Sequence, residues 1–285
     1  MVGRNRIAIL VAEFLGTGLL AMVMLSVQHS TIGLPYFVAL AAGLTLAVAM
    51  VALGRSGGGH FNPAITIGMW TARQIKTIPA VAYIAAQMLG AWAAYYLYTY
   101  FVKTSLPTIG GHYDSHVLVA EAVGAFVLAM GYAAAVFNRF WSVKTAGTVG
   151  TSYMLAIIVA AAVVVTGGMG IGIVNPAVAL SMRAFDVFGS MGWGTYALGP
   201  ILGAVIGFNL YALLFAPENS LARMRAVMGE KSGRAVAATT ISEAVEIAAE
   251  EETDDEEEAE AEAEEKPAAK HHSNKHGKNR KNHKK

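Results

Sequence analysis

The triplet Asn-Pro-Ala occurs twice in this chain, at Asn62-Pro63-Ala64 and at Asn175-Pro176-Ala177. An Asn at the N-cap accepts hydrogen bonds from free backbone N–H groups, and Pro at the first helical position loses none, so each triplet predicts a helix start. Glycine-dense chain precedes both triplets, and the apolar stretches after them end near Thr71 and Ala184. Because a bilayer-spanning helix needs about 20 residues, we predict two half-helices that enter a membrane without crossing it.

Charged residues are distributed so unevenly that they divide the chain into two parts. Residues 1–217 contain only four acids, Glu13, Asp114, Glu121 and Asp186, out of 20 in the chain. Long uncharged intervals within this part are typical of transmembrane helices. We therefore predict a membrane domain, residues 1–217, with six spans at about 7–27, 36–54, 78–101, 117–137, 147–167 and 194–216.

Residues 218–285 form the second part and are predicted to be a tail. It begins with a short amphipathic segment and continues with an acidic block and a basic, His-rich block, which are typical of disordered chain. Lys and Arg gather at one set of span ends, and the positive-inside rule then places both termini in the cytoplasm. Cysteine is absent, and no residue spacing in the membrane part predicts a catalytic pairing, a cofactor or a metal site.

The membrane domain contains an internal duplication, with repeat one at about 7–101 and repeat two at about 117–216. Ala12-Glu-Phe-Leu-Gly16 matches Ala120-Glu-Ala-Val-Gly124, and the triplets occupy equivalent positions. Each repeat has three full spans, an odd number, so the second repeat enters the membrane from the opposite side and the shared site lies near the midplane. The predicted fold class is an all-α membrane protein with six transmembrane helices and two re-entrant half-helices, arranged as inverted repeats around a central pore.

Backbone carbonyls before the triplets are candidate pore-lining groups, because non-helical chain at membrane depth must line a cavity or be enclosed by protein. The predicted carbonyl ladder consists of Gly58, Gly59, His60, Ile171, Gly172 and Ile173. The amides of Asn62 and Asn175 would orient a passing molecule where the half-helices meet. The positive ends of both half-helices would face the pore centre and oppose cations and protons, while a neutral molecule would pass.

Two carboxylates, Glu13 and Glu121, lie at matched positions inside the first and fourth spans. A charge there costs about 2.5–3.5 kcal/mol on insertion scales, so each carboxylate needs a function. We predict that they accept hydrogen bonds from the glycine-rich loops and hold them in place. A proton relay is the alternative.

The sequence resembles the aquaporin and glycerol-facilitator family over roughly residues 7–216. The resemblance rests on both triplets, on the segment from Ser56 to Gly68, on the Ala-Glu-x-x-Gly openings of spans one and four, and on Tyr83, Gln87 and Gly90. It implies a passive channel in the plasma membrane, assembled as a homotetramer. It also implies a protein that is not an enzyme, has no cofactor and binds no nucleic acid.

One position departs from the family pattern, since Val178 stands where an Arg usually follows the second triplet. The other predicted filter positions are Ala42, Val163 and Gly172, so the filter would be wide and apolar. The predicted function is a channel for water and small uncharged solutes. The alternatives are a facilitator for a particular neutral solute such as a polyol, a closed-pore structural or adhesion protein, and a proton-coupled transporter that uses Glu13 and Glu121.

Overall fold

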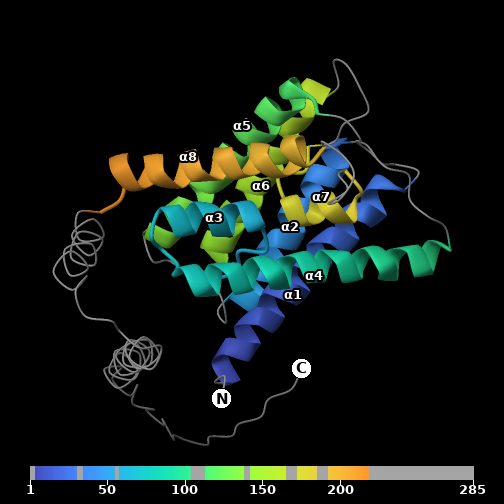
Figure 1. Ribbon diagram of the computed structural model, residues 1–285, viewed down its shortest axis with the longest axis horizontal. Helices are drawn as coiled ribbons and strands as arrows, with labels where there is room; N and C mark the ends of the chain where they lie inside the picture. The colour runs from blue at the N-terminus through green and yellow to red at the C-terminus, as the bar shows by residue number, and fades with distance from the viewer. Residues whose placement is uncertain are drawn as a thin grey trace, which may run out of the picture. The chain divides into compact units, whose positions relative to one another are not determined.

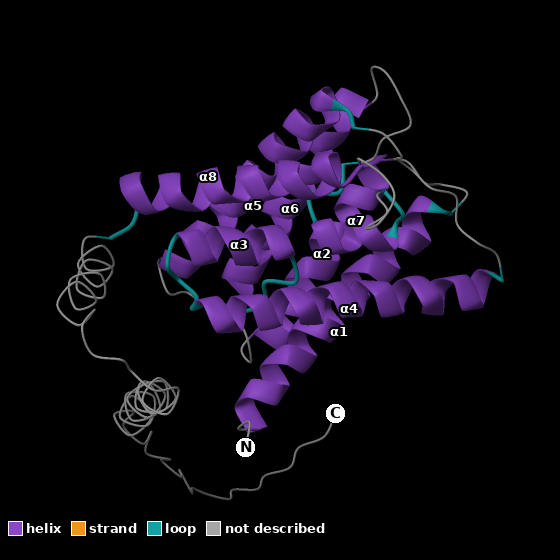
Figure 2. Cartoon of the chain, viewed as in Figure 1, coloured by secondary structure: helices purple, strands orange, loops and turns teal. Residues whose placement is uncertain are grey.

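A computed structural model describes residues 4–30, 35–54, 58–103, 113–137, 142–164, 172–184 and 192–217. These residues all belong to one compact unit, Met1–Ala226. Within the described ranges the regular elements are helices joined by loops, and no strand occurs (Figure 2). The predicted tail, residues 218–285, and the ladder residue Ile171 lie outside the described residues.

Six helices in the described ranges are long and apolar enough to cross a bilayer. They are α1 (Arg4–Gln28), α2 (Pro35–Leu53), α4 (Thr77–Val102), α5 (Ser115–Phe137), α6 (Val143–Val164) and α8 (Gly199–Leu214). A π-helical turn, η2 (Gly194–Leu198), precedes α8, and together they form an apolar segment of 21 residues. The prediction of an all-α fold with six membrane-spanning helices is therefore confirmed.

Two short helices begin at the triplets, α3 (Pro63–Thr71) and α7 (Pro176–Ser181). Asn62 and Asn175 are their N-caps, each in an extended conformation with its side-chain oxygen accepting backbone N–H groups. The expected end of the second half-helix, Ala184, is wrong. Arg183 adopts a left-handed φ of 54°, and the N–H of Ala184 donates to the Ala179 carbonyl, which closes α7 earlier.

The packing of the helices follows the duplication in the sequence. α1 packs against α4, and α5 packs against α8, which is the equivalent pair in the second repeat. Each half-helix also packs against a long helix of the other repeat: α3 of repeat one packs against α8, and α7 of repeat two packs against α4 (Figure 1). Each triplet is therefore held by helices of both repeats.

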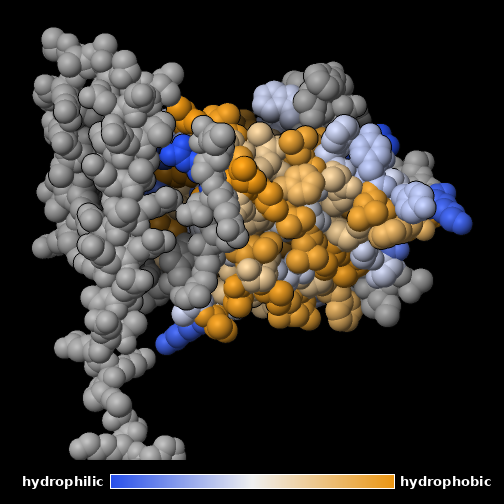
Figure 3. All heavy atoms as spheres, turned by 90° about the horizontal axis from the view of Figure 1, so that it is seen from below, coloured by the Kyte–Doolittle hydropathy of each residue, from blue (hydrophilic) through white to orange (hydrophobic). Residues whose placement is uncertain are grey.

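Large apolar side chains remain exposed along the long helices. Ile78 is 82 %, Tyr100 76 % and Leu213 72 % exposed, and Figure 3 shows an apolar surface over the described residues on one face. Soluble proteins rarely expose apolar patches of more than a few hundred Å². Lipid is the environment that suits this surface.

Glycines allow α2 and α6 to cross in close contact. A Cβ on Gly150 would overlap the carbonyl oxygen of Gly43 and lie 2.8 Å from the Cβ of Ala47. A Cβ on Gly43 would meet the Gly150 carbonyl at 2.5 Å. Small residues at helix crossings are typical of membrane proteins, because association there depends on close van der Waals packing.

We expect Gly150→Ala to destabilise the protein by about 1–3 kcal/mol, because the added methyl group overpacks this crossing. The matched control is Gly147→Ala in the same helix, where an added Cβ has no neighbour within 4 Å and Ala favours the helix. The thermal unfolding midpoints of both variants in detergent provide the test. Equal midpoints would contradict the close crossing of α2 and α6.

Candidate functional site

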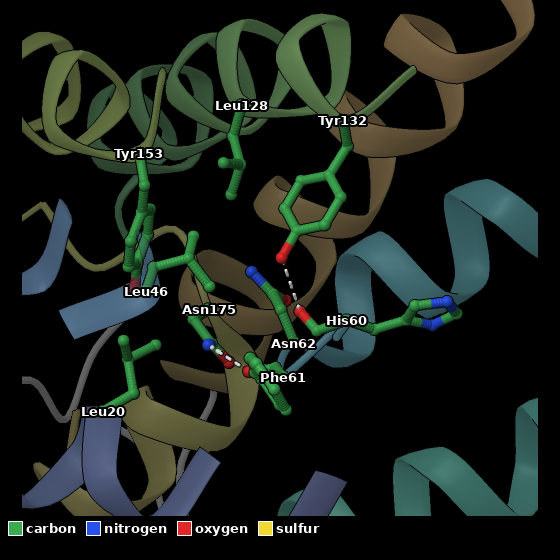
Figure 4. A pocket seen from close by; sticks show the side chains of 9 residues that line it. All are labelled: Leu20, Leu46, His60, Phe61, Asn62, Leu128, Tyr132, Tyr153 and Asn175. Atoms are coloured by element: carbon green, nitrogen blue, oxygen red, sulfur yellow. Dashed lines mark hydrogen bonds between the residues drawn. The ribbon is translucent and has the colours of Figure 1, made fainter. Parts of the chain in front are cut away.

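The structure brings the two triplets together through a reciprocal pair of hydrogen bonds. Nδ2 of Asn62 donates to the carbonyl oxygen of Val174 at 2.9 Å. Nδ2 of Asn175 donates to that of Phe61, also at 2.9 Å (Figure 4). Each Asn therefore binds the residue that precedes the other triplet. The N-termini of α3 and α7 meet here, and the contact formed by Asn62, Asn175 and the two loop carbonyls is called the joint.

The oxygen atoms of the two amides cap their own half-helices. Oδ1 of Asn62 accepts from the N–H of Ala64 at 2.9 Å, and Oδ1 of Asn175 accepts from that of Ala177 at 3.1 Å. Each amide gives one N–H group to the opposite loop, and within the described residues its second N–H group is left as a donor.

Each predicted loop-supporting carboxylate binds the backbone of the two residues that precede a triplet. The two oxygens of Glu13 accept from the N–H groups of His60 at 2.9 Å and Phe61 at 2.8 Å. The two oxygens of Glu121 accept from those of Ile173 at 2.7 Å and Val174 at 2.6 Å. Both carboxylates are buried, and both engage two consecutive N–H groups of a loop.

The hydrogen bonds that each Glu accepts from two consecutive loop N–H groups form a clamp. This clamp explains an unusual backbone conformation that the sequence did not reveal. Phe61 and Val174 have φ values of 47° and 58°, a left-handed conformation that is rare for bulky and β-branched residues. Such strain costs about 1–3 kcal/mol per residue and persists only where the surroundings enforce it. Here the N–H of each residue is bound by a Glu and its carbonyl by an Asn.

A second polar cluster holds the loop before the first triplet. Nε2 of Gln87 donates to Glu13 at 2.7 Å and to the Thr66 hydroxyl at 2.9 Å. The Thr66 hydroxyl also lies 3.1 Å from Nδ1 of His60. The His60 ring therefore points away from the Asn pair (Figure 4). Among the described residues no group of His, Asp or Glu is placed to hold a metal ion.

A narrow cavity lies at the joint, and in this conformation it has no room for a water molecule. Its lining residues are Leu20, Leu46, His60, Phe61, Asn62, Leu128, Tyr132, Tyr153 and Asn175. Most of its wall is apolar, and its polar groups are the two amides, backbone carbonyls and two tyrosine hydroxyls (Figure 4).

The tyrosines bind three carbonyls of the predicted ladder. The Tyr132 hydroxyl donates to the carbonyls of Gly59 at 2.9 Å or His60 at 3.0 Å, and the Tyr153 hydroxyl donates to that of Ile173 at 2.9 Å. Gly58 lies in the loop before the first triplet and Gly172 in the loop before the second, and both loops are largely buried.

Sequence reasoning missed both tyrosines. The spacing of Leu128 and Tyr132, 7 and 11 residues after Glu121, puts all three on one helix face and could have identified Tyr132. Nothing in the sequence around Tyr153 marks it in the same way.

The predicted filter positions are covered by neighbouring atoms where the structure describes them. Ala42 and Val178 are 0 % exposed, and Gly172 is buried. Val163 belongs to α6, but its side chain lies outside the described residues. The wide filter therefore stays a prediction.

Comparison with known proteins identifies the family. The family model described as major intrinsic protein matches residues 4–211, most of the chain. This chain belongs to the major intrinsic protein family. Its members are membrane channels, so the predictions of family and of a protein that is not an enzyme are confirmed, and the chain is a multi-pass membrane protein.

Individual relatives and a solved structure agree with this assignment. The chain is 28 % identical to aquaporin AqpM of Methanothermobacter thermautotrophicus, over 62 % of this chain and 76 % of that protein. It is 31 % identical to glycerol uptake facilitator protein-like 6 of Lactiplantibacillus plantarum, over 68 % of this chain and 92 % of that protein. The X-ray structure of the aquaglyceroporin from Plasmodium falciparum matches with a TM-score of 0.60 at 19 % identity, covering 76 % of this chain and 99 % of that one.

We expect Glu121→Gln to destabilise the fold, because the Gln amide would place an N–H₂ group against the N–H of Ile173 or Val174. A buried donor left without its acceptor costs about 1–3 kcal/mol. The control is Thr17→Val in α1, because the buried Thr17 hydroxyl has no partner in the described structure and its loss is expected to be neutral. Unfolding midpoints in detergent test this, and equal midpoints for the two variants would contradict the clamp.

Proposed function

We propose that this protein is a passive channel for water and small uncharged solutes, and that the path passes between Asn62 and Asn175. The carrying observation is the joint itself, where two amide groups meet in a cavity with apolar walls. A polar stripe in an apolar wall offers hydrogen bonds to a small molecule while excluding bulk water.

The chemistry of the joint favours neutral molecules over ions. The residues that line the cavity include no Asp, Glu, Lys or Arg, and the His60 ring points away from the Asn pair (Figure 4). Both half-helices begin at the joint, so their free N–H groups present positive potential there. A cation would lose its hydration without gaining a compensating charge.

In this proposal Glu13 and Glu121 support the loops and do not transfer protons across the membrane. Their oxygens already accept two consecutive loop N–H groups each. Proton transfer through either carboxylate would disturb the clamp that keeps Phe61 and Val174 in place. Solute flux should therefore be independent of a proton gradient.

A polyol facilitator is the second candidate, favoured by the similarity to glycerol uptake facilitator protein-like 6. The absence of an Arg at Val178 removes a bulky cation from the predicted filter, which would admit molecules larger than water. The location in the plasma membrane, the cytoplasmic termini, the homotetramer and the pore role of the ladder and filter residues all remain part of the proposal.

Osmotic shrinkage of liposomes that contain the purified protein tests the proposed function. We expect stopped-flow light scattering to show faster water efflux than in protein-free liposomes, with no added proton leak. Urea and glycerol gradients in the same preparation separate a water channel from a polyol facilitator. Flux equal to that of empty liposomes for every solute would support a closed-pore structural protein and contradict a channel.

A further inference from the structure

We propose that Tyr132 and Tyr153 set the size limit of the channel, so that molecules are selected by size at the Asn pair and not at the outer filter. This inference rests on the proposed channel function and assigns the selection to two residues of the same site. The two side chains flank the joint, one beside the loop that precedes each triplet (Figure 4).

Tyr132 reaches the joint from α5. Its side chain is 1 % exposed, and its hydroxyl lies 2.9 Å from the carbonyl oxygen of Gly59 and 3.0 Å from that of His60. A single O–H donates to one acceptor at a time, so the hydroxyl is held between the two carbonyls. Any molecule that moves along this loop must pass the ring.

Tyr153 reaches the joint from α6 on the side of the second triplet. Its side chain is also 1 % exposed, and its hydroxyl donates to the carbonyl of Ile173 at 2.9 Å and lies 3.6 Å from Sδ of Met24. The hydroxyl therefore occupies an acceptor of the ladder in the same cavity wall as Asn175.

The duplication shows that these tyrosines are not part of the shared framework. Met24 lies 11 residues after Glu13, as Tyr132 lies 11 after Glu121, so Met24 is its counterpart. Gly43 and Gly150 meet at the α2–α6 crossing, and Leu46 and Tyr153 each follow one of these glycines by three residues. An apolar side chain in repeat one thus corresponds to a tyrosine in repeat two at both positions.

Side chains elsewhere along the proposed path are smaller. The outer filter positions Ala42, Gly172 and Val178 offer no large group, and the other walls of the cavity are Leu20, Leu46 and Leu128. The two tyrosine rings are the bulkiest side chains at the Asn pair apart from Phe61, whose carbonyl is bound by Asn175. The bulky side chains of the proposed path therefore lie at its centre.

Passage past a tyrosine requires an exchange of hydrogen bonds. A backbone carbonyl has two lone pairs, so a small molecule with its own O–H or N–H group can bind the carbonyl as the hydroxyl moves aside. A molecule without a donor would leave a buried carbonyl unpaired, and a large one would not fit between the rings. The substrate class is thus small neutral hydrogen-bond donors.

Substitution of the tyrosines in liposomes tests the proposal. We expect Tyr132→Phe and Tyr153→Phe to raise water permeability by roughly twofold to tenfold, the effect of one net hydrogen bond. We expect Tyr132→Leu and Tyr153→Leu to admit larger molecules in a graded series from urea to glycerol to a four-carbon polyol. The matched control is Tyr98→Phe, a buried tyrosine of α4 whose ring lies 6.0 Å from that of His29 and outside the cavity.

The outcomes separate this inference from the proposed function. If the wild-type protein conducts water and both Leu variants keep its size limit, the inference is wrong and the channel function stands. If Val178→Ala alone raises the limit, selection takes place at the outer filter and the inference is wrong. If neither the wild-type protein nor any variant conducts, although size-exclusion chromatography and circular dichroism show folded protein, both proposals are wrong.

Discussion

The reciprocal hydrogen bonds between the two Asn side chains and the two loop carbonyls are the interaction on which the rest of the structure depends. In the proposed channel both loops end inside the membrane, where lipid cannot satisfy backbone groups, so the two loops must satisfy each other. Asn62 binds Val174 and Asn175 binds Phe61, while Glu13 and Glu121 bind the N–H groups of the same two residues. The left-handed backbone of these residues directs each N–H and each carbonyl to its partner.

This joint gives a physical meaning to the repeated Ala-Glu-x-x-Gly sequence. The Glu binds the loop backbone, and the Gly three residues later makes room for the side chain of the same loop residue. A Cβ on Gly16 would overlap the Phe61 ring, and a Cβ on Gly124 would lie 3.0 Å from Cγ2 of Val174. One helical turn of α1 and one of α5 therefore fix both the backbone and the side chain of a strained residue.

The sequence predicted those features that arise from repetition and helix chemistry. Asn-Pro identified both half-helix starts, and uncharged intervals identified the six spans. The matched positions of Glu13 and Glu121 suggested that each binds a glycine-rich loop. The left-handed backbone of Phe61 and Val174 was not predictable, because it arises from tertiary contacts that override the preference of bulky residues. Tyr132 and Tyr153 were missed because a tyrosine in an apolar helix carries no sign of its partner until the fold brings a carbonyl to it.

A cysteine placed at the joint gives the most direct test that solutes pass between the two triplets. The chain has no native cysteine, so Leu128→Cys introduces a single thiol into the cavity wall, and Leu202→Cys places one on the exposed surface of α8. We expect a mercury(II) salt to reduce water flux through liposomes with the Leu128→Cys protein, and a thiol reagent to restore it, with no effect on Leu202→Cys. Flux through Leu128→Cys that mercury leaves unchanged would contradict a path between the triplets.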